Sequence, residues 1–252
     1  MTFSVSNRNM TSDASKLPED TLKSLEEAQC VQPSEDPVVA SLRGFGPLGI
    51  LAIIIILAGN GLFVPLSAIL VLVWVHLSRT PWREIGYVRP RSWIATVAFG
   101  IVFGIALKFL MKAIVMPLLG AEPINQAFHY LAGNRAALPG AIFAMIVGAG
   151  FGEETVFRGY LFERLGKLFG SSVWATALIV LLTSAYFGIV HYPFQGLAGV
   201  EQATIVGLVY GTIFAVTGRI WMLMIAHAVF DLTALAMIYW NLESWVAHLV
   251  FK

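Results

Sequence analysis

The chain has 252 residues, of which 58% are hydrophobic and only 12% are charged. Soluble domains of this size are far more polar, so the composition predicts a membrane protein. We expect the lipid bilayer as a partner and no nucleic acid. Cys30 is the only cysteine, which excludes an intrachain disulfide and a cysteine-rich metal site.

Residues 1–43 differ from the rest of the chain because they hold seven of its fifteen acidic groups. We predict a cytoplasmic polar tail that is disordered or, at residues 17–30, forms a short amphipathic helix. The tail has no basic stretch followed by an apolar core. We therefore expect no cleavable secretory signal, and the first apolar run would act as a retained anchor.

Seven apolar segments can be matched to the roughly 20 residues that a helix needs to cross the hydrocarbon layer. They are 45–60, 61–78, 93–114, 138–163, 172–191, 199–217 and 220–240. The first two segments could form either one span or two, since Gly59-Asn60-Gly61 is the only turn signal between them. The sequence predicts an all-α, polytopic bundle of about seven transmembrane helices over residues 44–252.

Basic residues indicate the orientation of this bundle, because loops that stay in the cytoplasm are enriched in Lys and Arg. Three such loops would lie on one side; they carry Arg79, Arg83, Arg89 and Arg91, then Arg164 and Lys167, then Arg219. This pattern predicts an integral protein of a bacterial-type inner (plasma) membrane with its N-terminus in the cytoplasm. Lys108 and Lys112 fall on the other side, and we expect them to snorkel toward the interface.

Small residues recur every four positions in two of the predicted spans. One run is Gly140, Ala144, Gly148 and Gly152; the other is Gly199, Ala203, Gly207, Gly211 and Ala215. Such runs form a smooth helix face where backbones can approach closely in lipid. We expect two tightly packed helices, although a general abundance of Gly and Ala in membrane helices would give similar runs.

Ionisable residues inside the predicted spans are the candidates for function, since burying them in a membrane is costly. They are Glu153, Glu154 and Arg158, then His191, then Glu201, and finally His227 and Asp231. An α-helix turns by about 100° per residue, so side chains four apart lie on one face. We therefore predict a Glu154–Arg158 ion pair that leaves Glu153 free, and a shared face for His227 and Asp231.

A free carboxylate, two imidazoles and an aspartate match the needs of hydrolysis, namely a base for water and groups that stabilise an oxyanion. The same groups also match the usual ligands of zinc. Both interpretations stay open at this point. The simplest alternative is that these residues are satisfied polar groups with a structural role.

The order of three short motifs resembles a known family. Glu153-Glu154 with Arg158 reads E-E-x-x-x-R, Phe187 with His191 reads F-x-x-x-H, and His227 with Asp231 reads H-x-x-x-D/N. Together they resemble the type II CAAX prenyl endopeptidases and the bacterial CPBP (bacteriocin-processing or Abi) intramembrane proteases. The resemblance covers about residues 138–240, where we expect the catalytic core.

The resemblance implies an endopeptidase that cleaves a membrane-associated or C-terminal peptide, which can be lipidated. Glu153 would activate water with His191, while His227 and Asp231 would bind the oxyanion or a metal. The eukaryotic members of the family it resembles look to have Asn at the last position. The Asp in this chain favours a divalent metal such as zinc, held by Glu153, His191, His227 and Asp231. Alternatives are a non-catalytic scaffold or immunity protein and a proton-coupled transporter that uses Glu201.

Depth along the spans predicts a distortion. His191 lies about 25 Å along its helix from Trp174 and Glu153 about 17 Å from Arg164, at 1.5 Å per residue. These lengths place His191 and Glu153 at different depths in the membrane, so we expect span five to tilt or to start below the membrane surface. Its helix should end near Pro193. Residues 192–199 would then line a wet pocket in which His191 lies beside Glu153 and His227.

Overall fold

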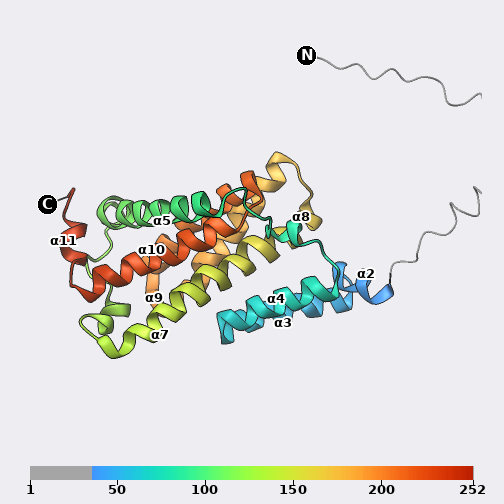
Figure 1. Cartoon of the computed structure of the whole chain (residues 1–252), viewed down its shortest axis with the longest axis horizontal. Coiled ribbons are helices and arrows are strands. Elements are labelled where there is room, and N and C mark those ends of the chain that lie inside the picture. The colour runs from blue at the N-terminus through green and yellow to red at the C-terminus, as the bar shows by residue number, and fades with distance from the viewer. Residues whose placement is uncertain (1–35, 252) are drawn as a thin grey trace, which may run out of the picture.

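The computed structural model describes residues 36–251, which are helical and contain no β-strand (Figure 1). The predicted amphipathic helix at residues 17–30 lies outside these described residues. The all-α prediction is confirmed for the residues that the structure describes.

The first helices are short and lie together at one side of the bundle (Figure 1). They are α2 (Pro37–Arg43), α3 (Pro47–Leu62) and α4 (Val64–Leu77). Helix α2 begins where the Asp36 side chain accepts a hydrogen bond from the backbone N–H of Val38 (2.9 Å), as an N-cap does. Residues 37–43, predicted as part of the tail, are therefore helical.

The break between α3 and α4 lies at Phe63 and not at the predicted Gly59-Asn60-Gly61 turn. Both glycines remain within α3, and Gly59 is used for packing: a Cβ placed there would lie 3.6 Å from the Cα of Ser67. Ser67 also donates a hydrogen bond from Oγ to the Ile56 carbonyl (2.6 Å). Gly59 and Ser67 thus lie at the contact between the two helices.

Four helical segments of residues 36–251 are long and apolar enough to cross a membrane. They are Trp93–Leu118, Arg135–Phe169, Val173–Thr217 and Trp221–Tyr239. The pair α2 and α3, bent by 54°, would make a fifth. The chain is thus an integral membrane protein by composition and helix length, whereas the predicted count of seven spans is not confirmed.

These segments are built from shorter elements. The first contains α5 (Trp93–Leu110), the π-helix η3 (Met111–Val115) and α6 (Met116–Leu118); the second contains η5 (Arg135–Ala137), α7 (Leu138–Phe143), the π-helices η6 (Ala144–Glu153) and η7 (Thr155–Tyr160), and α8 (Leu161–Phe169). The others are α9 (Val173–Thr217) and α10 (Trp221–Tyr239), with η2 (Trp82–Ile85), η4 (Gln126–Leu131) and α11 (Glu243–Ala247) outside them.

Helix α9 reverses direction at Gly196, whose φ of 62° and ψ of −157° are not helical. Only glycine adopts this conformation readily. The two arms then pack on each other, since a Cβ on Gly207 would lie 3.1 Å from Ser184 and one on Gly211 would lie 3.4 Å from Val180. The second run of small residues is therefore a packing face, and the prediction that the helix ends near Pro193 is wrong by three residues.

The first run of small residues does not form one packing face. A Cβ added to Gly140 or Gly148 would meet no atom within 4 Å, whereas one on Gly150 would lie 2.8 Å from both the Met224 carbonyl and the Ala228 side chain. The reason is that residues 144–160 are π-helical, with i→i+5 hydrogen bonds that change the phase. Gly150, outside the run, is the residue that packs on α10.

Helices α5 and α10 lie side by side and run in the same direction (Figure 1). A Cβ on Gly100 would lie 3.2 Å from the Met222 carbonyl, and one on Gly104 would lie 3.1 Å from the Phe230 nitrogen. Both contacts advance along α10 in the order in which they advance along α5. Lys108, one turn after Gly104, therefore lies near the level of Asp231.

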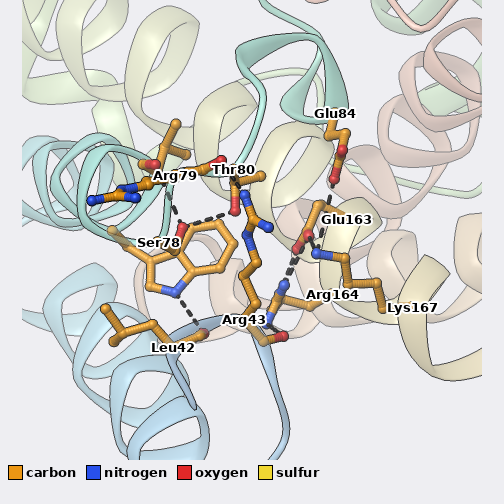
Figure 2. A network of polar contacts seen from close by, with 11 residues as sticks. Leu42, Arg43, Ser78, Arg79, Thr80, Glu84, Glu163, Arg164 and Lys167 are labelled. Carbon is orange, nitrogen blue, oxygen red and sulfur yellow. Dashed lines mark hydrogen bonds and ion pairs between the residues drawn. The ribbon is translucent and has the colours of Figure 1, made fainter. Parts of the chain in front are cut away.

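Charged residues from several loops meet at one end of the bundle (Figure 2). Arg164 donates from Nη1 to the Arg43 carbonyl (2.8 Å) and pairs with Glu163. Lys167 pairs with Glu163 (2.5 Å) and, more distantly, with Glu84 (3.8 Å). The end of α2, the loop after α4 and helix α8 thus share one charged network, which includes basic residues from two of the three loops that the sequence placed on one side.

Candidate active site

The π-helical stretch presents the two adjacent glutamates to different partners. Glu153 is the last residue of η6, and Glu154 stands between η6 and η7. Glu154 is fully buried and pairs with Arg158 through Oε1 and Nη1 (2.9 Å). The ion pair predicted from the four-residue spacing is therefore present.

The Arg158 guanidinium is enclosed by aromatic rings. Its Cζ lies 4.7 Å from the Phe187 ring centroid and 5.5 Å from that of Tyr210. Cation–π contacts of this kind stabilise a desolvated guanidinium. Together with Glu154 they explain how an arginine that is only 2% exposed is accommodated inside the bundle.

His227, on α10, is the residue that joins the acidic groups. Its Nδ1 lies 2.7 Å from Glu154 Oε1, while its Nε2 lies 3.6 Å from Glu153 Oε2 and 3.9 Å from Asp231 Oδ2. Glu154 accepts a hydrogen bond from Nδ1–H, which fixes the ring and directs Nε2 toward the other two carboxylates. The sequence did not predict this second role for Glu154, since Glu154 and His227 are 73 positions apart.

His191 comes from the first arm of α9. Its Nδ1 lies 2.7 Å from the Phe187 carbonyl oxygen, so this nitrogen donates and Nε2 is left available. The Phe187 ring contacts both imidazoles, with centroid distances of 4.7 Å to His191 and 6.0 Å to His227. Phe187 thus positions His191 through its backbone and packs against both histidines through its ring.

All four candidate residues line one cavity. A space of about 230 Å³ is bordered by Glu153, His191, His227 and Asp231. Glu201 is not among the residues that line it. The expected mismatch in depth is thus resolved: His191 lies near the reversal of α9 and shares the cavity with Glu153, although the surrounding backbone is helical.

The two lysines of α5 do not snorkel outward as predicted. Lys108 and Lys112 are 6% and 9% exposed and point into the protein. Lys108 donates to Gln202 Oε1 (3.2 Å) and Lys112 to Glu243 Oε1 (3.1 Å). Lys108 also lines the cavity that holds the acidic groups. Its position within an apolar segment was the available signal, since an intramembrane cation is by default a functional candidate.

Glu153 carries a buried oxygen that lacks a donor. Its Oε2 is inaccessible and accepts no hydrogen bond from the described residues. Buried carboxylate oxygens almost always accept hydrogen bonds, from water where no protein group is near. The Glu153 side chain also lines the cavity, and the polar side chains gathered there provide hydrogen-bonding partners for an ordered water molecule.

The same residues do not form a metal site as they stand. Within residues 36–251, no three His, Cys, Asp or Glu side chains are grouped so that they could hold a metal ion. The donor atoms are chemically suitable, but one His227 nitrogen is already bonded to Glu154 and one His191 nitrogen to a carbonyl. The arrangement therefore does not fit a preformed zinc centre, although imidazole and carboxylate donors are present.

Tyr87 supports the π-helix from outside the membrane segments. Its hydroxyl lies 2.8 Å from Thr155 Oγ1, and Thr155 in turn donates to the Phe151 carbonyl (2.7 Å). Burial raises the pKa of Tyr87 to about 12, against a smaller opposing effect of the Thr155 hydrogen bond. The loop before α5 is thereby tied to the residue next to Glu154.

Comparison with known proteins supports an assignment at the family level. The family model described as type II CAAX prenyl endopeptidase Rce1-like matches residues 135–233. This segment runs from η5 into α10 and contains all three motifs. Over these residues the chain is similar to that family, as the motifs predicted. No curated protein and no solved structure matches the chain.

Proposed function

We propose that the protein is an intramembrane endopeptidase of the type II CAAX class. It would hydrolyse a peptide bond near the end of a membrane-associated peptide or protein, lipidated substrates included. The observation that carries the proposal is the cavity inside the apolar bundle that Glu153, His191, His227 and Asp231 line together.

In the proposed reaction, Glu153 takes a proton from a water molecule that His191 also contacts. The water oxygen bonds to the carbonyl carbon of the scissile peptide, and the carbonyl oxygen becomes an oxyanion. When the intermediate collapses, the C–N bond breaks and Glu153 delivers the proton to the leaving nitrogen. One water and one peptide bond thus give a carboxylate and an ammonium group.

His227 would stabilise the oxyanion. With Nδ1–H bonded to Glu154 at 2.7 Å, the ring can donate from Nε2 when it carries a second proton. Asp231 lies 3.9 Å from the same nitrogen. We propose that Asp231 orients His227 and, as a carboxylate, does not itself donate to the oxyanion.

Zinc remains a prediction from the sequence. Because the side chains do not form a preformed metal site, the reaction above assigns every step to residues of the chain. Elemental analysis of the purified protein, with turnover measured before and after chelation, would test this point directly.

The proposal is tested by reconstituting the full chain in liposomes with a fluorogenic farnesylated peptide that ends in cysteine, two aliphatic residues and methionine. Wild type should release the C-terminal fragment, and Glu153→Gln should lose at least about 100-fold in rate. The matched control is Gly148→Ala, because a methyl group there meets no atom within 4 Å.

Equal cleavage by wild type and Glu153→Gln would contradict the proposed function. Retention of a cellular phenotype by Glu153→Gln would favour the non-catalytic scaffold or immunity protein instead.

A further inference from the structure

Lys108 is a buried cation whose charge is not matched by a nearby carboxylate. Its Nζ lies 3.2 Å from the neutral Gln202 Oε1 and 4.6 Å from the Phe230 ring centroid. Asp231 and Glu243 influence it electrostatically, but among the described residues neither lies within ion-pair distance. Lys112, one turn further along, does have such a partner in Glu243 (3.1 Å).

The position of Lys108 relates it to the hydrolytic groups. It lines the cavity that holds Glu153 and His227, and also an adjoining cavity of about 240 Å³. Because α5 and α10 run in parallel with Gly104 beside Ala226 and Phe230, Lys108 lies about one helical turn, roughly 6 Å, beyond the level of His227. An extended peptide advances about 3.3 Å per residue, so this offset corresponds to a few residues of substrate.

A desolvated ammonium is costly unless an anion or several hydrogen bonds compensate it. Gln202 supplies one acceptor, and the amide NH₂ of the same side chain stays available as a donor. An ammonium beside an amide NH₂ forms a natural pair of donors for a carboxylate. In a peptide substrate, carboxylates occur at the C-terminus and on Asp and Glu side chains.

We propose that Lys108, with Gln202, binds a carboxylate of the peptide substrate and so determines where the chain is cut. This inference rests on the proposed peptidase function, and it adds a binding group that none of the three motifs contains. A free C-terminus bound at Lys108 would place a bond a few residues upstream beside Glu153.

The experiment measures binding separately from cleavage. Full-length Glu153→Gln protein in neutral-lipid nanodiscs is titrated with the farnesylated peptide as its C-terminal acid and as its C-terminal amide, with empty nanodiscs as the blank. The acid should bind at least about ten-fold more tightly than the amide, as expected for a charge-assisted pair. Adding Lys108→Met should remove this preference, and adding Lys108→Arg should retain it.

The matched control is Lys112→Met, which removes a neighbouring buried cation that already has a carboxylate partner and should leave the acid-to-amide ratio unchanged. Equal binding of acid and amide, or an unchanged ratio in Lys108→Met, would overturn the proposal and make Lys108 a positioning residue for Asp231. Failure to bind either form would overturn it too. Failure of the wild type to cleave, with the ratio intact, would instead contradict only the peptidase function.

A second arm identifies the source of the carboxylate. Amidated peptides that end in Asp or in Asn are compared in the same way. Preference for Asp that disappears in Lys108→Met would assign the site to an acidic side chain, whereas preference for the free acid alone would assign it to the C-terminus.

Discussion

Glu153 and Glu154 are neighbours in the chain but have different partners. Glu154 binds both Arg158 and His227 through a single oxygen, while Glu153 Oε2 lacks a hydrogen-bond donor among the described residues. The four-residue spacing predicted the first contact. The second could not be predicted, because it depends on how α10 packs against the π-helices.

The two glutamates should therefore respond differently to the same substitution. Glu154→Gln leaves the buried Arg158 without a charged partner, which should destabilise the fold by about 3 kcal/mol or more. Glu153→Gln should leave stability nearly unchanged while it abolishes turnover. Thermal unfolding in detergent, monitored beside peptide cleavage, separates the two effects, and equal melting temperatures would refute this division of roles.

Tyr87 gives a prediction about pH. Its pKa rises from 10.0 to about 12 in the folded chain, so the folded state holds this proton more tightly than the unfolded state does. The stabilisation is fully present below about pH 10 and is lost as the pH rises toward 12. The difference in unfolding free energy between wild type and Tyr87→Phe should therefore shrink over this range. A difference in unfolding free energy that stays constant between pH 10 and pH 12 would contradict the raised pKa of Tyr87.

At the scale of elements, the π-helices determine which side chains face the cavity. A regular α-helix over residues 144–160 would have placed Gly148 and Gly152 on one face, as the sequence suggested. In the π-helical geometry Gly150 meets α10 instead. Short π-helical segments are frequent at functional sites, and this one ends at the two glutamates.

The pair Gly148 and Gly150 tests this geometry. Alanine at Gly150 would place its Cβ 2.8 Å from the Met224 carbonyl, so α10 and His227 must shift, which should lower stability by about 1–3 kcal/mol and reduce turnover. Alanine at Gly148 should be neutral or slightly stabilising, since nothing lies within 4 Å. Melting temperature and cleavage rate check both variants. Similar effects at the two positions would contradict the assigned packing.

Helix boundaries were the least predictable features. Pro193 suggested a helix end, but the reversal occurs at Gly196, where φ is positive. Similarly, the glycines at 59 and 61 stay helical and the break lies at Phe63. The break at Phe63 directly precedes the first turn of α4, which contains Pro65, and the reversal at Gly196 uses a conformation that suits glycine. Several local signals compete in each stretch, and the sequence alone did not rank them.

At the scale of the whole molecule, the basic loops meet at one end (Figure 2), while α11 lies at the other (Figure 1). The sequence predicts that the end with the basic loops lies in the cytoplasm and that α11 lies on the opposite side of the membrane.

Cys30 allows a direct test of this topology, because it is the only cysteine. An impermeant maleimide should label it only after spheroplasts are permeabilised. In a Cys30→Ser background, Ser244→Cys on α11 should be labelled in intact spheroplasts, and the reverse pattern would invert the topology.

The sequence was informative where chemistry is local or patterned. Composition predicted the membrane class, and the ordered motifs predicted the family similarity over residues 135–233 and the residues that share the cavity. Charge rules placed Lys108 at the interface, although its position within an apolar segment was a signal for a functional role. Whether a long cation turns toward water or toward a protein cavity depends on neighbouring helices, here on Gln202 and Phe230.

The reversal of α9 at Gly196 also bears on biosynthesis. His191 and Gln202 lie on opposite arms near the bend, and each is only partly exposed once the arms pack together. An arm that entered the bilayer alone would present these groups to lipid without compensation. We therefore expect the translocon to release both arms as one hairpin, so that residues 173–217 behave as a single unit of insertion.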